Sequence, residues 1–297
     1  MCETLFHIQK RNGVSHTIKF PNRVWELEQD LFINLNKKLM LENYKERNYN
    51  EYPETVAKFY DIVYEKVRDA IDKKFYMDRI LSADGPVLEV GVGTGRLFLE
   101  SLNKGADIYG IDISDNMLNV LKSKLEEHEH YRVTRADMRD FDLDKKFKLI
   151  ISPFRVFSHM YTIEDQLAAL KCIKNHLDDD GIFIFDLFVP NPMMISKDMD
   201  NMLDFDGEYE PGKKLQRVVG IKTDYINQTN QISIQLKWED DNGYNVVDNK
   251  FDMRYYFRYE LEHLIKESGM KIKNMYGDYS YSPLTNKSND FVTECTK

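Results

Sequence analysis

The sequence predicts a doubly wound α/β fold, in which helices cover both faces of a mostly parallel sheet. Between residues 86 and 188, short apolar strands alternate with helical segments, which is the order of right-handed strand-helix-strand crossovers. The first strand runs directly into three alternating glycines and then a helix, a turn found at the carboxyl ends of strands in such sheets. Past residue 190 apolar and polar residues alternate, so a smaller antiparallel sheet is expected beside the parallel core.

Composition places the chain among ordinary globular proteins. With 297 residues, 42% of them hydrophobic and 31% charged, it can hold one large domain with additions. The formal net charge of -9 argues against a large nucleic-acid-binding surface, which usually shows as a basic stripe. The three cysteines are widely separated and odd in number, which fits a reducing compartment. No apolar run is long enough to span a bilayer, so we expect a cytoplasmic protein without a membrane partner.

The first 55 residues are predicted to form an N-terminal extension. Residues 5–20 alternate loosely around Asn12-Gly13, a dipeptide that suits a tight hairpin turn. Apolar residues at helical spacing predict a helix over 24–39, and a second helical stretch covers 56–81, just before the first core strand.

The core is predicted to contain five parallel strands joined by helices. The strands are expected at residues 87–90, 108–113, 131–135, 147–152 and 181–188. One connecting helix follows the glycines, another opens at Asp115, and a third covers 163–177. This order predicts one parallel sheet with helices on both of its faces.

The antiparallel part is predicted between the fifth strand and the last helix, over residues 191–258, here called the cap. Its strands are expected at 215–225, 231–238 and 246–257, with a hairpin turn at Asn242-Gly243. A helix over 259–268 and a hairpin of strands 271–276 and 291–295 then close the core sheet. Residues 56–190 and 259–297 therefore make up the predicted core, with seven strands.

The residues Gly91-Val92-Gly93-Thr94-Gly95, here called the glycine loop, indicate a nucleoside-cofactor site. Glycines let the chain turn sharply while backbone N–H groups approach a ligand, and the helix that follows favours an anionic group at its N-terminus. A dinucleotide fingerprint needs a small residue at the sixth position, where this chain has Arg96. The spacing therefore disfavours a dinucleotide.

With Glu89 ahead of it, the glycine loop resembles motif I of class I S-adenosylmethionine-dependent methyltransferases. Two later acids support this resemblance, because Asp112 and Asp137 each follow a predicted strand at the edge where open α/β sheets bind ligands. Asp112 has the spacing of an acid that accepts the ribose hydroxyls. The resemblance implies a Rossmann-like core and S-adenosylmethionine as cofactor, with S-adenosylhomocysteine as product. The cofactor-binding residues it implies are Tyr64, Glu89, Gly91, Gly93, Gly95, Asp112, Ile113, Asp137, Met138 and Ser152.

A narrower resemblance points to the acceptor. The segments 59–64, 137–141 and 157–160 look like those of the small-molecule N-methyltransferases that dimethylate nucleotide-linked amino sugars in macrolide biosynthesis. In that group the second tyrosine of Tyr-Asp-x-x-Tyr, here Tyr64, contacts the methionine end of the cofactor. A histidine after the fourth strand, here His159, is considered as general base, a role that its ordinary pKa permits.

The resemblance implies that the acceptor is a small molecule, with an amine as the group methylated, and a homodimer is compatible with it. By the resemblance, Glu89 helps to orient the methionine end, Asp137 accepts the adenine amino group and Met138 packs against the adenine ring. The cap would roof the acceptor pocket. Its walls are expected to include Tyr60, Phe154, Arg155 and Phe157.

Three other functions stay open at this point. Transfer to oxygen needs little more than the same alignment of donor and acceptor. Ser152-Pro153-Phe154 partly resembles the motif with which nucleic-acid base methyltransferases hold a flipped base, although the second proline is missing. A methyltransferase-like core could also bind a partner protein without catalysis. No cluster with metal-ligand spacing is present, so no metal is expected.

Overall fold

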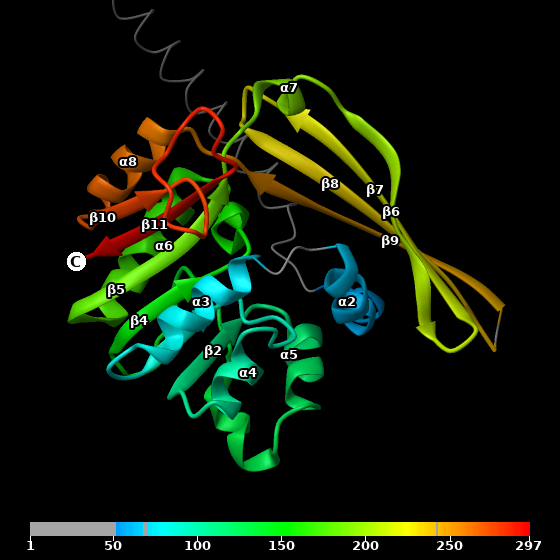
Figure 1. The fold of residues 1–297 in the computed structure, drawn as a ribbon, viewed down its shortest axis with the longest axis horizontal. Coiled ribbons are helices and arrows are strands. Elements are labelled where there is room, and N and C mark those ends of the chain that lie inside the picture. Colours follow the sequence, from blue (N-terminus) through cyan, green and yellow to red (C-terminus); the bar gives the residue numbers. More distant parts are fainter. Residues whose placement is uncertain (1–51, 68–70, 242) are drawn as a thin grey trace, which may run out of the picture. The chain divides into compact units, whose positions relative to one another are not determined.

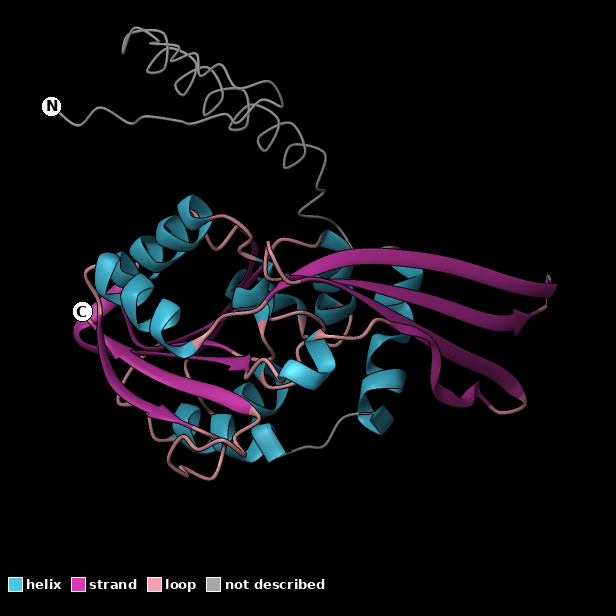
Figure 2. Cartoon of the chain, turned by 90° about the horizontal axis from the view of Figure 1, so that it is seen from above, coloured by secondary structure: helices cyan, strands magenta, loops and turns pink. Residues whose placement is uncertain are grey.

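The computed structural model describes residues 52–67, 71–241 and 243–297, in which a larger sheet has helices on both faces and a second sheet extends beside it (Figures 1 and 2). The chain divides into two compact units, Met1–Tyr49 and Asn50–Lys297, and the described residues all belong to the second. The predicted hairpin over 5–20 and helix over 24–39 lie outside the described residues. The division into extension, core and cap stays a prediction.

The larger sheet has seven strands in the order β10-β11-β5-β4-β1-β2-β3 (Figure 1). These are β1 (Val87–Val90), β2 (Ile108–Asp112), β3 (Val133–Arg135), β4 (Phe147–Ser152), β5 (Leu177–Phe188), β10 (Lys271–Tyr276) and β11 (Asp290–Thr296). The pairs among β1 to β5 are parallel, whereas β11 runs antiparallel to both β5 and β10. The doubly wound fold predicted from the sequence is confirmed.

Helices cover both faces of this sheet. The helices of the described residues are α2 (Glu54–Val67), α3 (Ile71–Leu81), α4 (Phe98–Asn103), α5 (Asp115–Lys122), α6 (Ile163–His176), α7 (Pro192–Ile195) and α8 (Arg258–Glu267), with 3-10 helices η1 (Glu127–Arg132) and η2 (Val156–His159). One apolar cluster joins α6 and α8 to the sheet, and a second joins α3, α4 and α5 to it. The hydroxyls of Ser114 and Thr162 cap the N-termini of α5 and α6. They accept the backbone N–H groups of Met117 and Asp165 at 3.2 and 3.0 Å.

The second sheet lies within residues 199–254 and is antiparallel throughout, in the order β6-β7-β8-β9. Its strands are β6 (Met199–Glu210), β7 (Lys213–Asp224), β8 (Thr229–Asp240) and β9 (Gly243–Arg254). The sequence predicted the last three strands but missed β6. That strand is rich in Asp and Glu, which disfavour strands, and it lies at the sheet edge with several register shifts.

Helix α2 packs against this second sheet. Val56, Phe59 and Val63 on α2 form an apolar cluster with residues of β7 and β8, among them Leu215 and Leu236. Burial of these side chains stabilises the contact, since each fully buried aliphatic or aromatic side chain contributes about 1.5–3 kcal/mol. Among the described residues, no helix is long and apolar enough to cross a membrane.

Candidate functional site

The glycine loop connects β1 to α4 through three residues with left-handed backbone, Gly91, Gly93 and Gly95, whose φ angles are 75°, 55° and 90°. A Cβ added at Gly91 would lie 2.5 Å from Cγ2 of Val156, so this glycine is needed for packing. A Cβ added at Gly93 would meet nothing within 4 Å. The backbone at Gly93 therefore faces open space, where a ligand could approach it.

Asp112 at the end of β2 is hydrogen-bonded to the glycine loop. Its Oδ2 accepts the N–H of Gly93 at 2.8 Å, and its Oδ1 accepts the N–H of Ser114 at 2.9 Å. The structure thus brings together two residues that the sequence analysis assigned to one site, although they are 19 positions apart. The neighbouring Ile113 uses its carbonyl to accept Nε of Arg135 at 3.1 Å.

Glu89 on β1 is a buried carboxyl group, only 3% exposed. Its Oε2 has no hydrogen-bond partner among the residues that the structure describes, and the same holds for the buried Oγ of Ser152 at the end of β4. Burial raises the pKa of Glu89 to about 8, although the cation of Arg96 lowers it. A buried carboxyl without a partner suits a cationic group of a ligand.

Arg96 forms an ion pair with the buried Asp72 of α3. Nη1 and Nη2 of Arg96 lie 3.2 and 2.6 Å from the two carboxylate oxygens, the forked geometry that arginine favours. Asp72 is 2% exposed, whereas the side chain of Arg96 is 30% exposed, so the carboxylate is desolvated and the guanidinium only partly. This contact explains why a long basic side chain stands where a dinucleotide fingerprint has a small residue.

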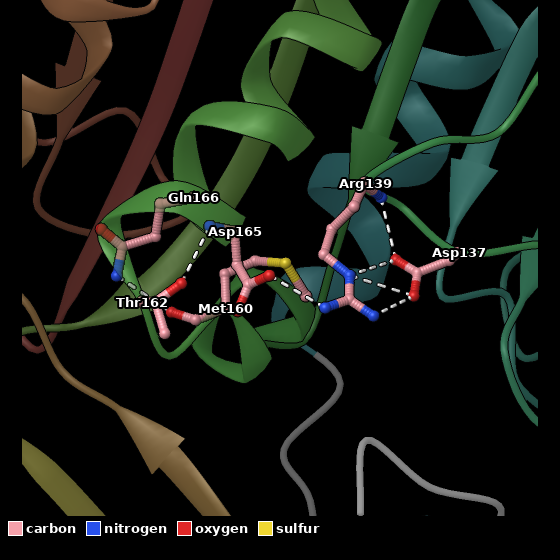
Figure 3. Close-up of polar contacts among 6 residues, drawn as sticks. All are labelled: Asp137, Arg139, Met160, Thr162, Asp165 and Gln166. Atoms are coloured by element: carbon pink, nitrogen blue, oxygen red, sulfur yellow. Dashed lines mark hydrogen bonds and ion pairs between the residues drawn. The ribbon is translucent and has the colours of Figure 1, made fainter. Parts of the chain in front are cut away.

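Asp137, which follows β3, is held by Arg139 (Figure 3). Its Oδ1 accepts the backbone N–H of Arg139 at 2.9 Å, and the guanidinium lies 2.6 Å from its Oδ2. Arg139 also pairs with Asp165 of α6 at 2.9 Å. In the same region Nε2 of Gln166 donates to the carbonyl of Met160 at 3.0 Å. This network fixes the segment after β3 to the start of α6, with the carboxylate of Asp137 already bound to a cation.

Met138 is 5% exposed and belongs to the apolar cluster that also contains Ile111 and Phe141. Phe157 is fully buried and contacts Phe185, with ring centroids 5.3 Å apart. The structure therefore places both predicted site residues in the apolar core.

Two aromatic residues of α2 meet the segment that follows β4. The rings of Tyr60 and Tyr64 lie 4.3 Å apart, and the ring of Phe154 meets Tyr64 edge-on at 5.4 Å. Arg155, the next residue, instead pairs with Asp290 of β11 at 3.1 Å. The structure thus brings three of the four predicted aromatic site residues of these segments together, and it directs Arg155 to the last strand.

His159 lies at the end of η2, where it contacts the second sheet. Its Nδ1 is 3.4 Å from the hydroxyl of Tyr161, and its ring lies 5.7 Å from that of Phe251 on β9. Burial lowers the pKa of His159 to about 4, partly offset by a hydrogen bond to the backbone of Asp252. The imidazole is therefore neutral near pH 7.

A shallow aromatic hollow of about 10 Å³, room for about one water molecule, lies between α2 and the second sheet. It is lined by Tyr52, Val56, Phe59, Tyr60, Val63, Tyr64, Arg217, Ile234 and Leu236. The guanidinium of Arg217 lies 4.7 Å above the ring of Tyr64 and pairs with Asp204 at 2.6 Å. Sequence reasoning missed Tyr52 and Arg217, which stand in segments without a recognisable motif.

Asp61 was also missed, although it is the acid of the Tyr-Asp-x-x-Tyr segment. Its Oδ1 accepts the hydroxyl of Thr94 in the glycine loop at 2.6 Å, and its Oδ2 pairs with Lys124. Lys124 in turn donates to the carbonyl of Thr94 at 2.9 Å. The Tyr-Asp-x-x-Tyr pattern itself could have suggested that the acid, and not only the tyrosines, serves the site. These contacts fasten α2 to the glycine loop.

The residues present fit S-adenosylmethionine. The space over Gly93 allows a nucleoside to approach the backbone, and Asp112 stands beside that space with its carboxylate. The unpartnered oxygen of Glu89 matches the ammonium of an amino-acid moiety. Among the residues that are described, no cluster of His, Cys, Asp and Glu could hold a metal ion.

Comparison with known proteins agrees with this fit. Residues 87–181 match a family described as a methyltransferase domain. The chain is 21% identical over 206 residues to YqeM of Bacillus subtilis (strain 168), named as a methyltransferase, covering 69% of this chain and 81% of that protein. It is 31% identical over 121 residues to an uncharacterized methyltransferase of Bacillus mycoides (strain KBAB4), covering 41% of this chain and 50% of that protein.

Solved structures share the fold. An S-adenosylmethionine-dependent methyltransferase from Clostridium acetobutylicum is similar with a TM-score of 0.65 and 19% identity, over 80% of this chain and 97% of that one. The sugar N-methyltransferase KedS8 from Streptoalloteichus is similar with a TM-score of 0.65 and 16% identity, over 80% of this chain and 93% of that one. The solved structures show the shared fold, and the matched methyltransferase domain, the methyltransferase relatives and the glycine loop show that the chain is an S-adenosylmethionine-dependent methyltransferase.

Proposed function

We propose that this methyltransferase acts on an amine of a small molecule that binds over the opening of the aromatic hollow, which by itself has room for about one water molecule. The observation that carries the proposal is the contact between the hollow and the cofactor side. Tyr64 lines the hollow and meets Phe154 of the segment after β4, while Asp61 on the same helix holds the glycine loop. Apolar and aromatic walls with few polar groups are typical of small-molecule sites. The similarity to a sugar N-methyltransferase supports an amine as the group methylated.

The chain's own residues would hold the cofactor in three places. Asp112 accepts the ribose hydroxyls, Glu89 faces the ammonium of the methionine end, and Asp137 lies at the adenine. S-adenosylmethionine, when bound, supplies a methyl group on a positively charged sulfur. The protein must align that methyl with the acceptor nitrogen and exclude water, and the walls of the hollow supply this alignment.

His159 is proposed to take the proton that the acceptor amine loses, although burial lowers its pKa to about 4 and makes it a weaker base than the ordinary histidine expected from the sequence. We expect His159→Ala to leave affinity for S-adenosylmethionine within about twofold and to lower kcat about 100-fold, the size of a general-base contribution. Because the pKa of His159 is about 4, its protonation should not slow the wild-type enzyme above about pH 5. Protonation of a histidine with an ordinary pKa would instead begin to slow the enzyme as the pH falls to about 6.5.

These expectations are checked by kcat from pH 5 to 9 and by calorimetry of cofactor binding. His128→Ala, at an exposed histidine, is the matched control and should behave as wild type. Normal turnover by His159→Ala with the true acceptor would remove the base role.

Glu89 should couple cofactor binding to pH. Because its pKa is about 8, the carboxyl is mostly protonated at pH 7, whereas pairing with an ammonium requires the carboxylate. Binding therefore releases a proton, and affinity should rise by up to about tenfold per pH unit between pH 6 and 7. Calorimetry at pH 7 in phosphate and in Tris should give different apparent enthalpies for the wild type.

Glu89→Gln should lose this dependence on the buffer. Glu100→Gln on α4, at an exposed carboxylate paired with lysines, should keep it. Buffer-independent enthalpies for the wild type would show that Glu89 does not change its protonation on binding.

The proposed function is tested with S-adenosylmethionine carrying a labelled methyl group. The protein is incubated with separate pools of nucleotide-linked amino sugars, simple amines, phenols, carboxylic acids and DNA, and each pool is searched by mass spectrometry for products that carry the label. Label in the amine pools supports the proposal. Label confined to phenols or carboxylic acids would establish transfer to oxygen, and label confined to DNA would establish base methylation, so either result overturns it.

A further inference from the structure

Two consecutive non-glycine residues after β4 have left-handed backbone. Phe154 and Arg155, with φ angles of 59° and 61°, follow Pro153 in the segment here called the β4 loop, residues 153–155. In this conformation Cβ approaches the following carbonyl oxygen, so side-chain-bearing residues adopt it only when their surroundings hold them there. A pair in succession therefore needs a strong external restraint.

Asp186 on β5 supplies that restraint. Its Oδ1 accepts the N–H of Phe154 at 2.8 Å, and its Oδ2 accepts the N–H of Arg155 at 3.2 Å. The hydroxyl of Tyr76 donates to Oδ1 at 2.6 Å. The carboxylate is 1% exposed, so these charge-assisted hydrogen bonds form away from water. Strand pairing explains why Asp186 lies next to these amides. Ser152 at the end of β4 pairs with Phe185, the residue before Asp186.

The β4 loop determines where several site residues lie. The ring of Phe154 meets Tyr64 in the aromatic hollow. Val156, the next residue after the loop, packs so closely on Gly91 that a Cβ there would lie 2.5 Å from it. The loop also begins η2, and Arg155 is the residue that precedes this helix with its left-handed conformation. One short segment thus touches the glycine loop, the acceptor hollow and the helix that ends at His159.

We propose that Asp186 is a positioning residue for methyl transfer, which acts by holding the β4 loop in its left-handed conformation. In this proposal Asp186 contacts neither S-adenosylmethionine nor the acceptor. Its effect is on the relative placement of Phe154, Val156 and η2. The part of the proposal that concerns transfer depends on the proposed function, whereas the part that concerns the loop does not.

The direct test is hydrogen exchange of the amides of Phe154 and Arg155. In the wild type both should exchange slowly for a loop, because both are bonded to a buried carboxylate. In Asp186→Asn the amide NH2 faces one of these donors, so exchange over residues 153–160 should be at least tenfold faster. Fast exchange of both amides in the wild type would overturn the proposal, even if the variant failed to fold.

The functional test separates placement from binding. Asp186→Asn should bind S-adenosylhomocysteine within about threefold of wild type. With the amine acceptor identified by the labelling experiment, it should lower kcat at least tenfold while KM for S-adenosylmethionine changes little. If no acceptor were found, the proposed function would fail, and the exchange and binding data alone would decide whether Asp186 holds the loop.

Two further variants exclude a merely structural role. Tyr76→Phe removes the hydrogen bond from Tyr76 to Asp186 but keeps the bonds from both loop amides. This variant should therefore lower Tm, while hydrogen exchange over 153–160 and turnover stay as in the wild type. Arg155→Gly in the Asp186→Asn background should recover part of kcat, because glycine adopts a positive φ without strain. Equal loss of turnover in Tyr76→Phe and Asp186→Asn, or unchanged exchange in Asp186→Asn, would refute the positioning role.

Discussion

Replacing Asp112 with alanine is expected to weaken binding of S-adenosylmethionine by at least about 100-fold. Two ribose hydroxyls would each lose a hydrogen bond to a carboxylate, and such bonds contribute about 1.5–3 kcal/mol apiece. The variant also loses the bonds that Asp112 accepts from the N–H groups of Gly93 and Ser114, so the glycine loop is less firmly held. Isothermal calorimetry with S-adenosylmethionine measures the change.

Asp107→Ala is the matched control, because Asp107 immediately precedes the same strand at its opposite end. It is exposed and pairs with Arg132 at 2.9 Å. Cofactor affinity should be unchanged in this variant. Equal affinity in Asp112→Ala and wild type would exclude Asp112 from the cofactor site, and a fall in both variants would point to general destabilisation instead.

Replacing Arg96 with alanine is expected to lower the free energy of unfolding by about 3 kcal/mol, the lower end of the usual cost of breaking a buried ion pair, because the side chain of Arg96 is 30% exposed. Asp72 is 2% exposed and accepts both nitrogens of the guanidinium. The same cation lowers the pKa of Glu89, so its loss should raise that pKa further and weaken cofactor binding near pH 7. Urea unfolding followed by circular dichroism gives the stability difference.

Lys104→Ala tests whether burial of the ion pair is the reason for the loss of stability expected in Arg96→Ala. Lys104 pairs with Glu100 at 2.7 Å on the exposed face of α4, and such surface pairs contribute about 0–1 kcal/mol. A loss in Arg96→Ala no larger than in Lys104→Ala would show that the buried pair contributes little to folding.

The core could be predicted because its signals are local. The apolar runs of β1 and β4 and the glycines between β1 and α4 each indicate their local structure within a few residues. The structure confirms both strands at the predicted bounds. The strand β3 is shorter than predicted, because residues 127–132 form the 3-10 helix η1. The strand β6 was missed because its pairing with β7 outweighs an acidic sequence of low strand propensity.

The site was only partly predictable, since several of its contacts join distant segments. Asp186 is the one polar residue in the apolar second half of β5, residues 182–188, and its bonds to Phe154 and Arg155 depend on which strand lies beside it. Tyr52 and Arg217 line the hollow only because α2 packs on the second sheet. The sequence pattern of each segment alone contains no information about these partners.

If the acceptor binds at the aromatic hollow as proposed, the double attachment of α2 would link the binding of the two substrates thermodynamically. This helix contacts the glycine loop through Asp61 and Thr94 and forms one wall of the aromatic hollow through Phe59, Tyr60 and Tyr64. A ligand that immobilises α2 from one side leaves less conformational entropy to be lost when the other binds. Such cooperativity is equal in both directions, so donor and acceptor would then strengthen each other's affinity by the same factor.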